Sequence, residues 1–206
     1  MRFRESLLAL FLLPIFLYPL CAEETEEPAK KTIEFPSPDG QFAFRHTGES
    51  LDEAQTFDLI DKRSKKKLLR VAEHDPDDGP SSRFEMNVVW RSDSKAFAVE
   101  ETLWKRGTSL AVYFRDGAAF REAKLPELRA EPAEREQGKF PHVVELDSKT
   151  VKQWQKNGSL VVEIESIADG GDDGSITVNR TVVLGFEAGK ARIVKSTRTV
   201  TRNKDG

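Results

Sequence analysis

The sequence predicts an all-β protein made of three consecutive four-stranded antiparallel meanders, with at most one short helix. Two observations predict this fold. Apolar residues alternate with polar ones over many short stretches, which is the pattern of a half-buried strand. A phrase made of an aromatic residue, a turn and a strand also recurs, at 35–44, 90–99 and 154–162. Such repetition indicates blade-like sheets, which we expect to form an incomplete propeller-like or sandwich-like array.

Residues 1–22 have the pattern of a secretory signal peptide. Two arginines precede an apolar run over 7–20, and acidic residues follow Ala22. The run is shorter than the ~20 residues of a membrane-spanning helix. We expect cleavage after Ala22 and export of the chain to the periplasm or the extracellular space. The charged segment 23–31 is then expected to be a disordered tether.

Cys21 is the only cysteine and leaves a lipoprotein anchor open as an alternative. Bacterial lipidation uses a cysteine at the cleavage point. The preceding Tyr18-Pro19-Leu20 lacks the small residue that such a peptidase needs, so we favour the secretory interpretation. Membrane contact is expected only if the N-terminal segment is retained or lipidated at Cys21. Cleavage after Ala22 removes the cysteine, so stability must come from core burial without disulfides.

The charge balance argues against a nucleic-acid partner. The net charge of the chain is −3 at pH 7. Binding to phosphates needs a strongly basic surface, so we expect no nucleic acid. The length suffices for one self-sufficient core. We therefore expect a single β domain over 32–202, made of units at 32–72, 85–124 and 141–201.

The first two units follow the same plan. In the first unit, Phe42 and Phe44 share one face of a strand, and the polar stretch 61–67 forms an exposed hairpin turn. In the second unit, 95–103 and 109–114 alternate. The following Asp116-Gly117 pair supplies the positive φ angles that a tight hairpin turn requires.

The third unit has the clearest alternation. The apolar residues on one face of its expected strands are Leu160, Val162, Ile164, Ile176, Val178, Val182, Leu184 and Phe186. Arg180 interrupts this face, so it either reaches solvent or is paired. Before these strands, the stretch 148–156 shows helix signals: a capping serine, Val151 and Trp154 three residues apart, and Asn157-Gly158 as a stop. These signals favour a short helix there over a strand.

The segments 37–43 (Ser-Pro-Asp-Gly-Gln-Phe-Ala) and 90–98 (Trp-Arg-Ser-Asp-Ser-Lys-Ala-Phe-Ala) resemble the blade motif of TolB-type and other WD-repeat-like β-propellers. In those families a Trp-Ser-Pro-Asp-Gly-Lys turn opens a strand of each blade. The resemblance implies scaffolding or binding without selecting one function. Asp39 to Asp93 is 54 residues and Asp93 to Asn157 is 64, against ~40–50 for usual blades. We therefore expect no standard closed propeller.

The sequence contains no motif of a known catalytic or cofactor site. A Gly-x-Ser-x-Gly elbow, a P-loop and a Gly-x-Gly-x-x-Gly turn are all missing. The histidines His46, His74 and His142 have no metal-ligand spacing. The acidic loops 74–79 and 169–174 lack the ligand pattern of a calcium loop, so solvated turns are favoured over calcium sites. We expect no cofactor and no metal, and assign no catalytic residue.

Charged residues on the expected strands and turns are interpreted first as solvated. Glu100, Glu101, Glu163 and Glu165 are interpreted as strand-edge charges rather than catalysts, because acidic residues are abundant throughout the chain. The basic run 62–67 is interpreted as a solvated hairpin tip rather than a contact for an anionic partner.

These observations favour an exported non-catalytic β domain that binds a protein or a cell-envelope component. Two alternatives stay open. A carboxylate-dependent envelope hydrolase requires converging carboxylates in a cleft. A secreted enzyme inhibitor requires a protruding loop, for which 74–82 and 125–139 are the candidates.

Overall fold

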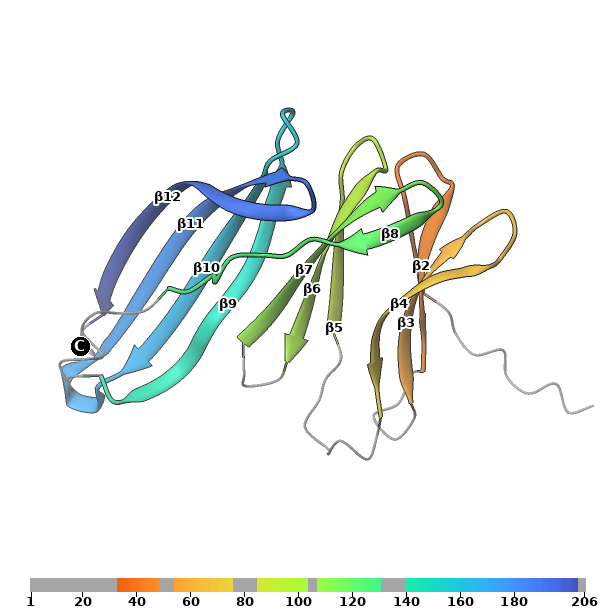
Figure 1. Cartoon of the computed structure of the whole chain (residues 1–206). Coiled ribbons are helices and arrows are strands. Elements are labelled where there is room, and N and C mark those ends of the chain that lie inside the picture. Colours follow the sequence, from red (N-terminus) through yellow and green to blue (C-terminus); the bar gives the residue numbers. More distant parts are fainter. Residues whose placement is uncertain (1–32, 49–53, 76–84, 104–106, 131–139, 204–206) are drawn as a thin grey trace, which may run out of the picture.

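The fold consists of three four-stranded antiparallel sheets arranged side by side in a row (Figure 1). This computed structural model describes residues 33–48, 54–75, 85–103, 107–130 and 140–203. In each sheet the strands follow one another in chain order, so each sheet is a simple meander. The predicted all-β class with three consecutive meanders is confirmed. The expected signal peptide and tether, 1–22 and 23–31, lie outside the described residues.

The strands occupy consecutive stretches of the chain. The first sheet contains β1 (Ile33–Pro36), β2 (Phe42–Thr47), β3 (Gln55–Asp61) and β4 (Lys67–His74). The second contains β5 (Glu85–Trp90), β6 (Ala96–Leu103), β7 (Gly107–Asp116) and β8 (Ala119–Glu122). The third contains β9 (His142–Trp154), β10 (Leu160–Asp169), β11 (Ser175–Glu187) and β12 (Lys190–Asn203). A 3-10 turn, Gly171–Asp173, joins β10 to β11. In the described ranges, no helix has the length and apolar character needed to cross a bilayer.

Aromatic rings fill the space between the first and second sheets, which we call the first interface. Phe44 stacks on Phe57 with ring centroids 4.9 Å apart, and Phe97 of the second sheet meets Phe44 edge-on at 4.8 Å. Tyr113 stacks on Phe97 at 4.9 Å. These side chains belong to one cluster because alternation along each strand directs every second residue to the same face.

Mainly aliphatic residues, together with the rings of Phe114, Trp154 and Phe186, fill the space between the second and third sheets, which we call the second interface. The second sheet contributes the small residues Ala98 and Val112, and the third sheet contributes larger ones. The fully buried residues of the third sheet in this cluster are Leu160, Val162, Ile164, Val178, Val182 and Leu184. The predicted apolar face of the third unit is therefore confirmed.

The short helix predicted over 148–156 is wrong. These residues continue the strand β9 to Trp154 and then turn. The register with β10 shifts between Val161 and Val162, so a β-bulge lies at Lys152. The bulge changes the alternation, which brings both Val151 and Trp154 to the second interface. Their spacing of three residues imitated a helix.

The recurring phrase forms the same turn before β2, β6 and β10. Each turn has an i→i−3 backbone hydrogen bond, from Gly40 to Ser37, from Ser94 to Arg91 and from Gly158 to Gln155, all 2.9 Å long. In each, a side-chain oxygen also accepts the backbone N–H two residues later, and these acceptors are Asp39, Asp93 and Asn157. The residues at positive φ are Gly40, Ser94 and Gly158. The third copy is therefore structurally equivalent, although its sequence match is poor.

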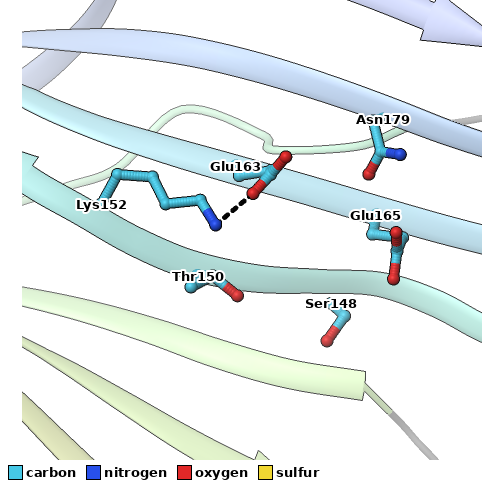
Figure 2. Close-up of a pocket in the computed structure, with 6 residues that line it drawn as sticks. All are labelled: Ser148, Thr150, Lys152, Glu163, Glu165 and Asn179. Atoms are coloured by element: carbon cyan, nitrogen blue, oxygen red, sulfur yellow. Dashed lines mark ion pairs between the residues drawn. The ribbon is translucent and has the colours of Figure 1, made fainter.

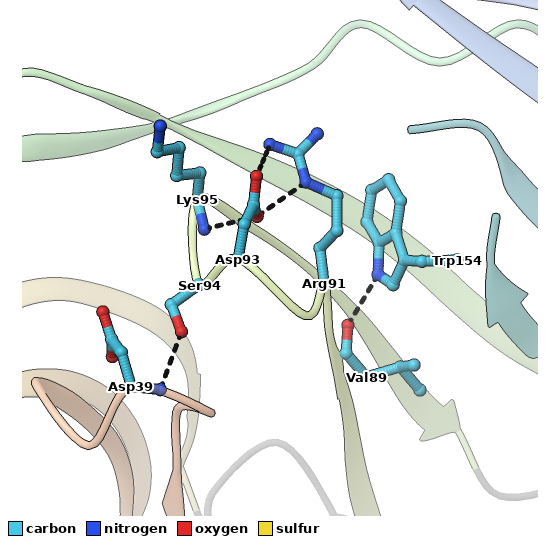
Figure 3. A network of polar contacts seen from close by, with 7 residues as sticks. All are labelled: Asp39, Val89, Arg91, Asp93, Ser94, Lys95 and Trp154. Carbon is cyan, nitrogen blue, oxygen red and sulfur yellow. Dashed lines mark hydrogen bonds and ion pairs between the residues drawn. The ribbon is translucent and has the colours of Figure 1, made fainter. Parts of the chain in front are cut away.

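These turns also connect neighbouring sheets (Figure 3). The backbone N–H of Asp39 donates to Ser94 Oγ across the first interface at 3.0 Å. Across the second interface, Trp154 Nε1 donates to Val89 O at 2.9 Å. Within the middle turn, Arg91 binds Asp93 through two nitrogens, at 2.8 and 2.9 Å, and these hydrogen bonds lower the pKa of the Asp93 carboxyl.

The segment after β8 crosses from the second sheet to the third. Lys124 forms a parallel bridge with Lys190 at the β11–β12 turn. Lys124 N–H donates to Gly189 O at 3.0 Å, and Ala191 N–H donates to Lys124 O at 2.9 Å. Leu128 and Ala130 are buried in the second interface. The described part of the candidate inhibitory loop 125–139 is thus packed rather than protruding. Residues 131–139 of that loop, and 76–82 of the other candidate, lie outside the described residues.

Candidate functional site

The two faces of the third sheet differ in chemistry. Along β10 the residues alternate strictly between buried and half-buried. The buried set, which begins with Leu160 and Val162, faces the second sheet. The other set includes Glu163 and Glu165 and belongs to the opposite side, which we call the outer face.

Strand register places polar side chains on the outer face in two rows that cross all four strands. The first row is Thr150, Glu163, Thr181 and Thr197. The second row is Ser148, Glu165, Asn179 and Thr199. Residues directly opposite each other on neighbouring antiparallel strands have Cβ atoms about 4.5–5.5 Å apart. The rows therefore form a continuous polar surface of hydroxyl, amide and carboxylate groups.

A shallow pocket of about 270 Å³ opens on this surface (Figure 2). It is lined by Ser148, Thr150, Lys152, Glu163, Glu165 and Asn179. An ion pair joins Lys152 Nζ to Glu163 Oε2, and both side chains are partly exposed, at 48% and 34%. The ammonium group of Lys152 thus compensates the negative charge of one of the two carboxylates in the pocket. The lining offers donors and acceptors to a polar ligand and presents almost no apolar surface.

Contacts with the second sheet fix the position of β9, the strand that carries Ser148, Thr150 and Lys152. Ser148 Oγ lies 3.1 Å from Thr108 Oγ. Lys149 Nζ donates to Asp147 O at 2.8 Å and to Thr108 O at 3.3 Å, and burial lowers the pKa of its ammonium group. Gly107 begins β7 with φ +86°, and a Cβ there would collide with the carbonyl oxygen of Leu146. Only glycine permits this close approach of β7 to β9.

Glu100 is not a strand-edge charge, contrary to the expectation from sequence. It lies on β6, an inner strand, and its side chain is buried. One carboxylate oxygen accepts the backbone N–H of Val151 on β9, and the other accepts Asn87 Nδ2 at 2.7 Å. The carboxylate thus links the second and third sheets. Glu101 lies on the same inner strand as Glu100, so it is not a strand-edge charge either. Glu163 and Glu165 lie on an inner strand of the third sheet, β10, and belong to the pocket.

The remaining candidates from the sequence stay apart. Within the ranges that the structure describes, no three His, Cys, Asp or Glu side chains gather as a metal site. The loop 169–174 is an exposed turn in which Gly171 N–H donates to Asp169 Oδ1 at 2.8 Å, and 76–79 of the other acidic loop lies outside the described residues. The basic run 62–67 forms the β3–β4 turn, where Ser64 donates to Asp61.

The sequence left open whether Arg180 reaches solvent or is paired, and the structure shows that it is paired. Its Nε donates to Ser196 Oγ and its Nη1 to Arg129 O, both at 2.9 Å. The side chain therefore crosses from β11 to β12 and to the segment after β8.

Sequence reasoning missed the polar members of the outer face, Ser148, Thr150, Asn179 and Lys152. The expected helix over 148–156 assigned three of them to another structure. Their pairing across strands depends on bulges that the sequence does not reveal. The alternation of serine and threonine at 148 and 150 and over 197–201 is the one signal that points to a polar sheet face.

No family model matches this chain, and no curated protein matches it significantly.

Proposed function

We propose that this chain is an exported, non-catalytic β domain that binds a protein or a cell-envelope component through the outer face of its third sheet. The observation that carries the proposal is the pair of polar rows that cross all four strands of this sheet. An array of side chains on rigid strands with only a shallow hollow suits an extended ligand better than a small molecule, which needs a deep concave site. Export is proposed from the pattern of residues 1–22.

One turn geometry recurs before β2, β6 and β10. This recurrence supports the proposed relationship to TolB-type and other WD-repeat-like propellers. Propellers of many kinds are binding scaffolds, and their functions differ widely. From this relationship we therefore infer only a general role as a binding scaffold.

Affinity capture of the tagged full-length chain from its native envelope, analysed by mass spectrometry, tests the proposal. Thr181 lies at the centre of the first polar row, so Thr181→Arg places a bulky charge on the outer face. Ser92→Arg, at an exposed turn of the second sheet, introduces the same side chain elsewhere. We expect Thr181→Arg to lose at least one captured component that Ser92→Arg retains. Identical captures with both variants would overturn the assignment of the outer face.

A second candidate function is favoured by one observation. Glu163 and Glu165 line the same pocket, and hydrolases of glycosides use a pair of carboxylates. A panel of glycan and ester substrates, assayed with the wild-type chain, Glu163→Gln and Glu165→Gln, separates the two functions. Turnover that is abolished by either substitution would establish the hydrolase and contradict the non-catalytic proposal.

A further inference from the structure

The two edges of the third sheet differ in regularity. On β9 the register with β10 shifts three times, and β7 packs beside this strand (Figure 1). On β12 the register with β11 shifts once, between Val183 and Leu184. From Lys195 to Asn203, nine successive residues of β12 pair with β11 without interruption. Bulges and covering elements are devices that prevent an edge strand from pairing with another chain, and this part of β12 has no bulge.

The regular part of β12 is exposed along its whole length. Every residue from Val194 to Asn203 is exposed, including Val194 at 51% and Val200 at 37%. With 14 residues, β12 is the longest of the strands described. An edge strand presents a row of N–H and C=O groups to a further strand. Nine residues extend this row over roughly 30 Å.

The charge around this edge is one-sided. The stretch Lys190–Asn203 (β12) contains no acidic residue, and the stretch Ser175–Glu187 (β11) contains one, Glu187, which pairs with Lys190 at the end of the strand. The basic residues in these stretches are Arg180, Lys190, Arg192, Lys195, Arg198 and Arg202. The whole chain nevertheless has a net charge of −3. An added strand therefore runs beside a strand rich in basic residues, on a protein whose overall charge is negative.

We propose that the β12 edge is a docking site for an extended acidic segment of a partner protein, which adds to the third sheet as a further strand. Main-chain hydrogen bonds supply the pairing and alternate side chains supply the specificity in this mode of recognition. The inference goes beyond the proposed function, because it concerns the edge of the sheet and not its outer face. Either can fail while the other holds.

A second copy of the chain does not fit this edge. Antiparallel pairing of two β12 strands would place five basic residues and no acidic residue of each strand along the shared edge. Like charges on directly opposite residues destabilise a strand pair. Charge complementarity therefore selects an acidic occupant.

Binding of a fluorescent, end-capped twelve-residue peptide of alternating glutamate and threonine to the full-length chain tests the inference. At low ionic strength we expect saturable binding with a dissociation constant below about 1 mM. Binding should weaken as salt is added. Amide hydrogen exchange over 195–203 should slow in the presence of the peptide.

Three controls define the site. The double variant Arg192→Glu/Lys195→Glu should weaken binding at least about tenfold, since each charge reversal loses an attraction and adds a repulsion. Lys66→Glu/Lys67→Glu, at the exposed end of the β3–β4 turn, reverses two charges on another sheet and should stay within about twofold of the wild type. A peptide of alternating glutamate and proline has the same charge but lacks half of the amide donors, so it should bind at least about tenfold more weakly.

The inference is overturned by any of three results. These are no saturation at millimolar peptide, equal binding of the proline peptide, and equal weakening by Lys66→Glu/Lys67→Glu and by Arg192→Glu/Lys195→Glu. Sedimentation analysis that shows the chain to be a dimer joined through β12 would also overturn it, because the edge would then belong to a second copy. Circular dichroism and thermal unfolding of each variant establish that it is folded.

Discussion

The two interfaces between neighbouring sheets are built from different chemistry. The first interface is a cluster of aromatic rings, in which Phe97 touches Phe44, Trp90, Tyr113 and Phe120. Its apolar character leaves one buried donor, Trp90 Nε1, without a hydrogen-bond partner. Within the described residues, no other buried side-chain nitrogen or oxygen lacks one. The second interface is mainly aliphatic, with a smaller group of rings from Phe114, Trp154 and Phe186. Several polar bonds cross it, whereas the polar bond described across the first interface is the one from Asp39 N–H to Ser94 Oγ.

The polar bonds of the second interface come from several elements. The carboxylate of Glu100 accepts the N–H of Val151, Trp154 donates to Val89 O, and Lys149 donates to Thr108 O. The rings of the first interface bury a large apolar area, but ring packing depends less strictly on geometry than a hydrogen bond does. Hydrogen bonds therefore fix the position of one strand relative to another more closely. We infer that the first interface supplies more of the stability and that the second fixes the position of β9, on which the outer face depends.

The largest expected effect comes from removing a ring of the first interface. Phe97 is fully buried, so Phe97→Ala should lower the free energy of unfolding by about 3–5 kcal/mol. Phe114→Ala makes the same change at the second interface, where the ring is only half-buried, and should cost about 2 kcal/mol. Urea-induced unfolding measures both. Equal costs would contradict the difference that we infer between the interfaces.

A smaller loss is expected from Glu100→Gln. The glutamine keeps one oxygen and replaces the other with an NH2 group, so one of the two donors, Val151 N–H or Asn87 Nδ2, loses its acceptor. An unsatisfied buried donor costs about 1–3 kcal/mol.

The adjacent Glu101 provides the matched control for this substitution. Its carboxylate is half-buried and accepts Ser109 Oγ at 3.2 Å. Glu101→Gln should therefore cost less than about 1 kcal/mol. If Glu100→Gln proves as stable as Glu101→Gln in thermal unfolding, the link between the second and third sheets does not need a carboxylate.

Features that depend on one strand or one turn were predictable from sequence. The alternation of Leu160, Val162 and Ile164 gave the correct buried face, because strand periodicity is a local property. The Asp116-Gly117 hairpin was predicted in the same way, and Gly117 has the expected positive φ of 61°.

Features that depend on a neighbouring strand or sheet were not predictable. The bulge at Lys152 gave Val151 and Trp154 a helical spacing on a strand. The burial of Glu100 exists only because β9 passes over it and offers a backbone N–H. The polar rows of the outer face need the register of four strands, and a single sequence does not specify that register when bulges interrupt it.

The smallest effects concern alkaline pH, where the two interfaces should respond with opposite sign. At the first interface, burial and then the nearby charge of Glu122 raise the pKa of Tyr113 to about 12, from 10.0 for a free phenol. The unfolded chain therefore loses this proton first. Stability from the neutral phenol is complete below pH 10 and falls as the pH rises from 10 through about 12. Tyr113→Phe should remove this decline.

At the second interface, burial lowers the pKa of Lys149 below its ordinary value of 10.5. The folded chain loses this proton first, so the cost of burying the ammonium group is relieved as the pH rises toward 10.5. Unfolding free energies measured from pH 8 to 11.5 for the wild type, Tyr113→Phe and Lys149→Met test both signs, because each difference from the wild type cancels the titration of all other groups. Relative to Lys149→Met the wild type should gain stability up to pH 10.5, and relative to Tyr113→Phe it should lose stability above pH 10. Differences that share one sign, or that do not vary with pH, would show that these two groups do not distinguish the interfaces.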